Sequence, residues 1–334
     1  MKKTLIFFLL LIILVFFTGY AFVFPLPWEE SHPVEIVIEP GESFLDLTDL
    51  LVEKGVVKNG WYFRYLARNY GVDRKIQAGR YRLKTSMDYR QALKVLTSRP
   101  EKGLYRVVIP EGFTVSQIAE RMAKEAKVSR RDFLSLALTG AANFQHSFLD
   151  TNLTPSLEGY LFPKTYLVWE GSEAKEVVKL MLDQFAKELK KLDLDKLSNR
   201  GLTLHKLVTI ASMIEKEAKL PSERRLISAV IYNRLSRGMR LQIDATVLYA
   251  LGYHKKRLFQ RDTMVNSPYN TYLYPGLPPG PICNPGLDSL KAALEPAPVD
   301  YLYYVLSDPK TGRHTFTRTE AEFLKAKEEA KKRW

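Results

Sequence analysis

Two glutamates that flank one lysine are the part of the sequence best suited to acid–base chemistry. They are Glu215 and Glu217, within the string Ala211-Ser212-Met213-Ile214-Glu215-Lys216-Glu217. A helix is expected from Thr203, a residue type that caps helix N-termini, to Leu220, which precedes a proline. At about 100° per residue, Glu217 falls within the apolar stripe of this helix and Glu215 on nearly the opposite side. Glu217 is therefore expected to be the less hydrated carboxyl.

The environment of Glu217 determines the chemistry that it can perform. A desolvated carboxyl has a raised pKa, because burial disfavours its charged form. When it is held protonated near neutral pH, such a group can donate its proton to the oxygen of a glycosidic bond as that bond breaks. The helix alone leaves a structural alternative open, in which the glutamate forms an ion pair with Arg or Lys at a domain edge.

Four residues in the segments that follow suit contacts with sugar hydroxyls and sugar faces. They are Gln242, Asp244, Asn270 and Tyr272. Each has a structural alternative. Asp244 is expected first of all to be the N-cap of a helix that ends at Gly252, and the other three have turn chemistry as their alternative.

The N-terminus carries an apolar segment as long as a membrane span. Met1-Lys2-Lys3 precedes an apolar run over residues 4–24, and Glu29-Glu30 follows it. A cleaved signal peptide has a shorter apolar region and a small-x-small cleavage site, which residues 18–22 match poorly. We therefore expect an uncleaved anchor. The positive-inside rule then places everything after Trp28 outside the cytoplasm.

A weak internal repeat marks a small module after the anchor. Residues 37–43 resemble residues 108–114, and each copy has the pattern of a strand, a turn and a Ser or Thr that caps a helix. Between them, residues 61–70 have a helical pattern and residues 79–83 the pattern of a returning strand, which together indicate a small α+β module. The module is similar to a LysM domain, which binds N-acetylglucosamine in cell-wall glycan. A spacer without binding function is the alternative.

Ordered motifs along nearly the whole chain resemble the YceG-like family, the endolytic murein transglycosylases. Besides the Glu-Lys-Glu string, these motifs are Leu157-Glu158-Gly159-Tyr160-Leu161-Phe162-Pro163, Asn233-Arg234-Leu235, Met239-Arg240-Leu241-Gln242, Tyr269-Asn270-Thr271-Tyr272, Asn284-Pro285-Gly286 and His314-Thr315-Phe316. The resemblance implies that Glu217, the second glutamate of the string, is the catalytic acid. Lys164 stands where relatives often carry Asp, so we assign no catalysis to the Glu158 motif.

The resemblance also implies the reaction. The C6 hydroxyl of muramic acid attacks its own C1, which cleaves the MurNAc–GlcNAc bond within nascent peptidoglycan strands. A 1,6-anhydro-MurNAc end remains, which would terminate strand elongation. One glutamate serves as acid and then as base, and no cofactor or metal is expected. A hydrolase on the same polymer and a glycan-binding scaffold for cell-wall synthesis enzymes are the alternatives. The hydrolase would add water, and the scaffold would bind without cleavage.

Charge and cysteine content exclude other classes of protein. The net charge of +13 is spread along the chain in short runs, so a nucleic-acid partner is not expected. The single cysteine, Cys283, cannot form an intramolecular disulfide, and with only five scattered histidines it argues against a Cys/His zinc site.

The expected fold class is α+β with an N-terminal transmembrane helix. We expect a transmembrane anchor over residues 1–25, a LysM-like glycan-binding module over residues 34–105 and a mixed α+β YceG-like catalytic domain over residues 106–334. The expected partners are peptidoglycan glycan strands, the cell membrane through the N-terminal helix, and cell-wall synthesis enzymes. The N-terminus is expected to be cytoplasmic and the catalytic domain extracytoplasmic.

Overall fold

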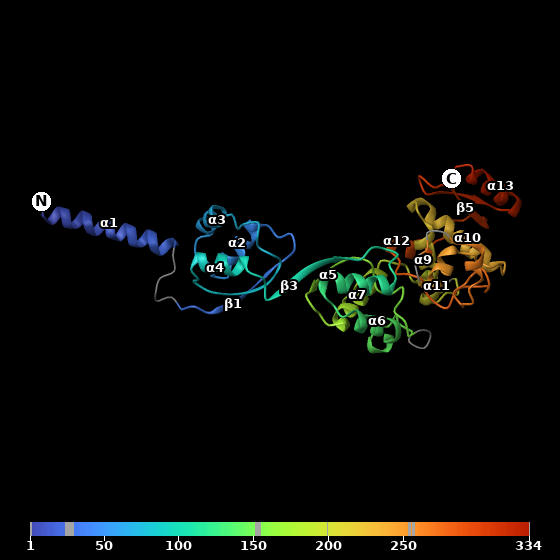
Figure 1. Ribbon diagram of the computed structural model, residues 1–334, viewed down its shortest axis with the longest axis horizontal. Helices are drawn as coiled ribbons and strands as arrows, with labels where there is room; N and C mark the ends of the chain where they lie inside the picture. Colours follow the sequence, from blue (N-terminus) through green and yellow to red (C-terminus); the bar gives the residue numbers. More distant parts are fainter. Residues whose placement is uncertain are drawn as a thin grey trace. The chain divides into compact units, whose positions relative to one another are not determined.

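The chain is a mixed α+β protein that divides into two compact units (Figure 1). The first unit comprises residues 1–107 and 166–171, and the second comprises residues 108–165 and 172–334. The structure is a computed structural model, and it describes residues 2–23, 30–150, 155–198, 200–252, 255 and 258–333. The predicted start of the extracytoplasmic part, after Trp28, lies outside the described residues.

The first unit is built on a four-stranded sheet of order β1-β2-β3-β4. Strands β1 and β2 are antiparallel, in a register that pairs Pro33 with Lys84 and Ile38 with Gly79. Helices α2, α3 and α4 gather on one side of β1 in Figure 1. The elements of this unit are α1 (Lys2–Val23), β1 (Pro33–Ile38), α2 (Phe44–Glu53), α3 (Gly60–Asn69), β2 (Gly79–Lys84), α4 (Tyr89–Thr97), β3 (Lys102–Val108) and β4 (Thr165–Trp169).

Local capping determines where the helices of this unit begin. Ser43, which the sequence predicts as an N-cap, accepts a hydrogen bond from the Asp46 N–H at 3.1 Å. Asn59 caps α3 in the same way through the Tyr62 N–H at 3.0 Å. The apolar faces of the helices and of β1 and β2 then form one core, whose largest buried side chains include Leu51, Phe63, Tyr81, Leu83 and Tyr89.

Helix α1 exposes apolar side chains from Ile6 to Phe17. The side chains of this helix are described for residues 6–19. A membrane-spanning helix needs about 20 predominantly apolar residues. Among the residues that the structure describes, no helix combines the length and the apolarity needed to cross a membrane. The structure therefore does not confirm the predicted transmembrane anchor.

The second unit is mainly helical and ends in a β-hairpin covered by a helix. Strands β5 and β6 are antiparallel, with Tyr304 opposite Phe316, and α13 packs on them. The helices and strands of this unit are α5 (Val115–Ala126), α6 (Arg130–Thr139), α7 (Ala174–Leu189), α8 (Asp195–Ser198), α9 (Leu204–Glu217), α10 (Arg224–Ser236), α11 (Asp244–Leu251), α12 (Leu287–Leu294), β5 (Tyr303–Asp308), β6 (Arg313–Thr317) and α13 (Glu320–Lys331). Three 3₁₀ turns are η1 (Ala141–Asn143), η2 (Pro221–Glu223) and η3 (Gln260–Met264).

Helix α9 packs against α10, α11 and α12 and is buried from Leu207 to Ile214. Its N-cap is Thr203, as predicted, but the helix ends at Glu217 and not at Leu220. The residue before a proline is driven out of the helical conformation. Leu220, which precedes Pro221, is accordingly extended. Ala218 is already extended as well, so Glu217 is the last residue of α9.

Candidate active site

The carboxylate of Glu217 lies beside strand β5. Its Oε2 accepts a hydrogen bond from the Tyr304 hydroxyl at 3.1 Å. Burial and, secondly, the negative charge of Asp244 raise the pKa of Glu217 to about 7. The Tyr304 hydroxyl, the Ala245 N–H and the charge of Lys219 act in the opposite direction. A carboxyl with this pKa is available in both protonation states near neutral pH, as a group that acts first as acid and then as base requires.

Asp244 and Tyr272 lie close to this carboxyl. Tyr272 donates a hydrogen bond from its hydroxyl to Asp244 Oδ1 at 2.5 Å. Burial raises the pKa of Tyr272, and the charges of Asp244 and Glu217 raise it further. Asp244 is exposed and Tyr272 is half-buried, so both side chains present atoms to the solvent. The structure thus brings two of the four predicted sugar-contacting residues to Glu217.

The prediction that Asp244 is an N-cap is wrong. Helix α11 begins at Asp244, and its N-cap is Ile243, which makes no side-chain cap hydrogen bond. The Ile243 N–H donates to Thr271 Oγ1 at 3.0 Å, and Thr246 Oγ1 donates to Ile243 O at 2.7 Å. Two threonines therefore organise this end of the helix. The carboxylate of Asp244 therefore accepts a hydrogen bond from the Tyr272 hydroxyl and does not cap a free N–H of the helix.

Gln242 is held next to Asp244 by a buried arginine. Its backbone is left-handed, with φ of 54°, and its exposed side chain accepts a hydrogen bond from Arg234 Nη1 at 3.2 Å. The same guanidinium donates to Leu241 O at 2.9 Å and to Leu302 O at 2.6 Å. Arg234 thus fastens the segment around Gln242 to the one that leads into β5. The sequence motif contained Arg234, but its positioning role was not predicted.

Asn270 has an architectural role, which corrects the prediction that it contacts sugar. Its side chain is fully buried. Its Nδ2 donates to Thr263 O at 2.9 Å and to Val265 O at 2.8 Å, and its Oδ1 accepts from the Tyr272 N–H at 3.0 Å. These bonds leave no exposed side-chain atom for a ligand. Asn270 instead shapes the loop that presents Tyr272, which is the turn chemistry that the sequence left open as its alternative.

Glu215 differs from Glu217 in its partners. Its side chain is only 8% exposed, so Glu215 is also shielded from solvent, which the helical pattern did not predict. Glu215 Oε2 accepts from the Gly286 N–H at 3.0 Å, and Arg224 lies 4.0 Å from its other oxygen. Glu215 thus has a backbone donor and a positively charged side chain beside it. Each glutamate also has a second carboxyl nearby: Glu111 beside Glu215, where Arg224 lies 4.0 Å from both carboxyls, and Asp244 beside Glu217.

Behind Tyr304 lies a buried contact between His314 and Glu223 that the sequence did not reveal. His314 Nδ1 is 2.7 Å from Glu223 Oε2, and the His314 N–H donates to Glu223 Oε1 at 2.9 Å. The ring of His314 meets that of Tyr304 edge-on, with centroids 5.5 Å apart. This pair fixes β6 beside Tyr304 and so orients the hydroxyl that binds Glu217. His314 belonged to one of the family motifs and Tyr304 to a run, residues 301–306, with the pattern of a strand, but no role at the site was predicted for Tyr304 or Glu223.

Glu158 is the second carboxyl with a strongly raised pKa. It is 4% exposed, and burial raises its pKa to about 8. It accepts hydrogen bonds from the Val115 N–H at 3.0 Å and from Asn284 Nδ2 at 2.9 Å. These contacts join the start of α5 to the segment before α12, which is a structural role. Within the described part of the chain, no group of three His, Cys, Asp or Glu side chains is arranged to hold a metal ion.

The fold is α+β, and the candidate site holds a carboxyl with a pKa of about 7 at the end of a buried helix. The model of the YceG-like family matches residues 36–329. The chain belongs to the YceG-like family.

The chain is similar to two named transglycosylases and to one protein of solved structure. It is 35% identical over 324 residues to the endolytic murein transglycosylase of Bacillus subtilis (strain 168), covering 94% of this chain and 89% of that protein. It is 33% identical over 317 residues to the enzyme of the same name from Streptococcus pneumoniae (strain ATCC BAA-255 / R6), covering 86% of this chain and 57% of that longer protein. A YceG-like protein from Listeria monocytogenes, solved at 2.6 Å, shares 35% identity and superposes with a TM-score of 0.62, covering 88% of this chain and 98% of that one.

Proposed function

We propose that this chain is an endolytic lytic transglycosylase that cleaves peptidoglycan strands, with Glu217 as its general acid and base. Two relatives that align with most of the chain carry the name endolytic murein transglycosylase. The observation that carries the assignment of Glu217 is the pKa of about 7 at a carboxyl beside exposed polar groups. A lytic transglycosylase needs only one such carboxyl, because no water molecule has to be activated.

The proposed reaction has two proton transfers through the same carboxyl. Protonated Glu217 donates its proton to the oxygen of the MurNAc–GlcNAc bond, and the bond between this oxygen and C1 of MurNAc breaks. The Glu217 carboxylate then takes the proton of the C6 hydroxyl, whose oxygen forms a bond to C1. The products are a 1,6-anhydro-MurNAc end and a GlcNAc end with a free hydroxyl. Glu217 is again protonated, and atoms and charges balance without water.

The groups around Glu217 have complementary roles in this proposal. The Asp244 carboxylate raises the pKa of Glu217 and would stabilise the positive charge that develops at C1. The Tyr272 hydroxyl positions that carboxylate through a hydrogen bond of 2.5 Å to Asp244 Oδ1. Gln242, exposed on the same segment as Asp244, and Tyr272, half-buried beside it, are the proposed sugar contacts.

The mass of the products tests the proposed reaction. We would incubate the full-length chain with purified peptidoglycan and weigh the released fragments. Anhydro-muropeptides, which lack one water relative to the products of hydrolysis, are the expected result. Products with reducing ends would identify a hydrolase, and binding without release would identify a scaffold. A Glu217→Gln variant, in which the carboxyl proton is lost but the shape is kept, should release neither product.

We further propose that helix α1 anchors the chain in the cell membrane, with the second unit outside the cytoplasm. The support is the row of exposed apolar side chains from Ile6 to Phe17, preceded by Lys2 and Lys3. A reporter fused to the C-terminus should be active only if it functions outside the cytoplasm. Activity of a cytoplasm-specific reporter at this position would contradict the topology.

Two finer roles belong to the same proposal. The small module over residues 34–105 would bind glycan as a LysM-like domain, and the enzyme would terminate strand elongation beside cell-wall synthesis enzymes. Deleting residues 34–97 should weaken binding to glycan strands while some cleavage remains. Unchanged affinity after the deletion would favour the spacer alternative. Cross-linking in living cells, followed by identification of the captured proteins, tests the partnership with synthesis enzymes.

A further inference from the structure

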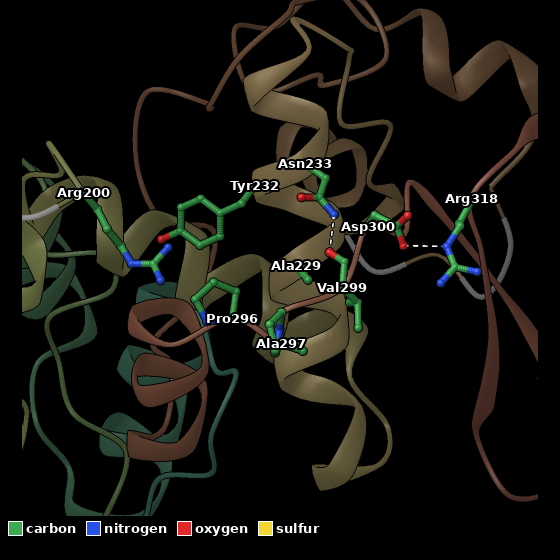
Figure 2. A pocket seen from close by; sticks show the side chains of 10 residues that line it. Arg200, Ala229, Tyr232, Asn233, Pro296, Ala297, Val299, Asp300 and Arg318 are labelled. Atoms are coloured by element: carbon green, nitrogen blue, oxygen red, sulfur yellow. Dashed lines mark hydrogen bonds and ion pairs between the residues drawn. The ribbon is translucent and has the colours of Figure 1, made fainter.

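A pocket of about 510 Å³ opens between helix α10 and the segment that joins α12 to β5 (Figure 2). One wall is a face of α10, and the other is a proline-rich turn over residues 296–300. All its lining residues belong to the second unit. No part of this pocket belongs to the Glu217 site described above. The residues that matter for its chemistry are Arg200, Tyr232, Asn233, Pro296, Asp300 and Arg318.

Each end of the pocket carries an arginine, and the two differ in whether an acidic side chain compensates the positive charge. Arg200 and Arg318 lie at opposite ends in Figure 2. Arg318 Nε is 2.5 Å from Asp300 Oδ1, so its charge is compensated. Arg200 forms no ion pair with any described residue; its guanidinium lies 5.6 Å from the ring centroid of Tyr232 and is exposed. An uncompensated guanidinium above an aromatic ring is suited to bind a carboxylate.

Between these ends the pocket offers an apolar surface and one hydrogen-bond acceptor. Tyr232 and Pro296 present apolar surface, and the Tyr232 hydroxyl is already bonded to Ala293 O at 2.7 Å. Asn233 Nδ2 donates to Val299 O and Tyr301 O, each at 2.9 Å. The oxygen of the Asn233 side chain points away from Val299, toward Tyr232, in Figure 2. It is therefore available to accept an N–H, as in a peptide bond.

The segment that forms the pocket wall continues directly to the catalytic carboxyl. The side chain of Asn233 donates a hydrogen bond to Tyr301 O, and that of Arg234, the next residue of α10, donates one to Leu302 O. Two residues further along the chain, the Tyr304 hydroxyl donates a hydrogen bond to Glu217. Tyr304 follows Asp300 by four residues, and four residues of extended chain span at most about 14 Å. A short peptide attached to a sugar at Glu217 could therefore reach the Asp300 end of the pocket and extend from there along Tyr232 toward Arg200 at the other end.

We propose that this pocket binds the stem peptide of the peptidoglycan substrate, with a carboxylate of the peptide on Arg200 and the chain along Tyr232 and Pro296. The proposal rests on the proposed function and deepens it, because it assigns the peptide part of the substrate to a site of its own. A short peptide with a free carboxylate matches the charge at one end, the apolar wall and the acceptor of Asn233.

The test compares two substrates with full-length protein. One is a preparation of glycan strands that carry stem peptides, and the other is the same preparation after an amidase has removed the peptides. Arg200→Ala should lower kcat/KM about tenfold on the peptide-bearing strands, since a charge-assisted hydrogen bond is lost. It should leave kcat/KM on the bare strands unchanged. Arg131→Ala is the matched control, because Arg131 is an exposed arginine of the second unit that does not line the pocket.

Direct binding gives an independent measurement. The stem peptide released from peptidoglycan should bind the Glu217→Gln protein, and amidation of its terminal carboxylate or the Arg200→Ala change should each weaken binding about tenfold. If Arg200→Ala impairs both substrates equally, or neither, the proposal is overturned. If wild type releases no anhydro-muropeptides from either substrate, the proposed function fails, and the peptide-binding measurement still decides whether the pocket is a peptide site.

Discussion

Removing one hydroxyl and removing one charge should move the pKa of Glu217 in opposite directions. In Tyr304→Phe, Glu217 Oε2 loses the hydrogen bond that it accepts at 3.1 Å, and this bond favours the charged carboxylate. The pKa of Glu217 should therefore rise above about 7. In Asp244→Asn, a negative charge that disfavours the carboxylate is lost, so the pKa should fall.

The expected size of each shift follows from the contacts. A hydrogen bond to a charged group contributes about 1.5 kcal/mol at the lower end of its range, and one pKa unit corresponds to about 1.4 kcal/mol. Tyr304→Phe should thus raise the pKa of Glu217 by about one unit. Asp244 ranks after burial among the causes of the raised pKa. We therefore expect Asp244→Asn to lower the pKa by about one unit or less.

These shifts change the fraction of Glu217 that can act as an acid. At pH 8 this fraction is about 10% for a pKa of about 7, about 50% after a rise of about one unit, and about 1% after an equal fall. The assay is kcat/KM for release of anhydro-muropeptides between about pH 5 and pH 9, because its basic limb reports the essential acid of the free enzyme. The limb should move to higher pH in Tyr304→Phe and to lower pH in Asp244→Asn.

Tyr274→Phe serves as the matched control. The Tyr274 hydroxyl donates to Asn266 Oδ1 at 2.7 Å, and the residue is exposed, so its loss should leave the limb in place. The comparison uses the position of the limb and not the absolute rate, which either variant changes for other reasons. Two limbs that coincide with wild type, or that move in the same direction, would refute Glu217 as the group whose protonation controls cleavage.

The remaining predictions concern four carboxyl and amide side chains. Glu217→Gln should reduce release of anhydro-muropeptides by about 10²–10⁴-fold or more. Glu215→Gln should affect this rate less, but it should lower the midpoint of urea unfolding because it weakens the contacts with Gly286 and Arg224. The reverse ranking of the two rates would move the catalytic assignment to Glu215. Asn270→Ala should lower the free energy of unfolding by about 2 kcal/mol, because two loop carbonyls lose their hydrogen-bond donor. An unchanged urea midpoint would show that the loop keeps its conformation without these hydrogen bonds. Glu158 has a folded-state pKa of about 8 against 4.5 in its unperturbed form, so the folded protein binds more protons and stability should fall as pH rises between these values, by up to about 5 kcal/mol. Glu158→Gln should flatten this dependence in urea titrations at several pH values, and an equally steep dependence in the variant would assign the effect to other groups.

Local sequence determined where several helices begin. Ser43, Thr114 and Thr203 were recognisable as N-caps, and each accepts a backbone N–H within its own first turn. Such bonds join residues three positions apart, so the sequence alone contains the information. The same local reasoning misjudged Asp244, because threonines from outside and inside the helix determine that N-terminus.

The candidate acid was likewise visible in the sequence, whereas its environment was not. The Glu-Lys-Glu string singled out Glu217, but the helical pattern did not show that the side chain of Glu215 is also buried, at 8% exposed. Helical periodicity describes which side chains share a face. It says nothing of which distant segment covers that face, and so gives no account of Gly286 and Arg224 at Glu215.

Only the tertiary structure decided what makes Glu217 an acid. Tyr304 reaches it from β5, 87 residues away along the chain, and Asp244 reaches it from α11. Arg234 fastens the segment before β5, and Asn270 shapes the loop that carries Tyr272. A pKa depends on burial and on the charges nearby in space. The residue type was therefore determined by the sequence, while its protonation near neutral pH arises from segments that meet only in the folded chain.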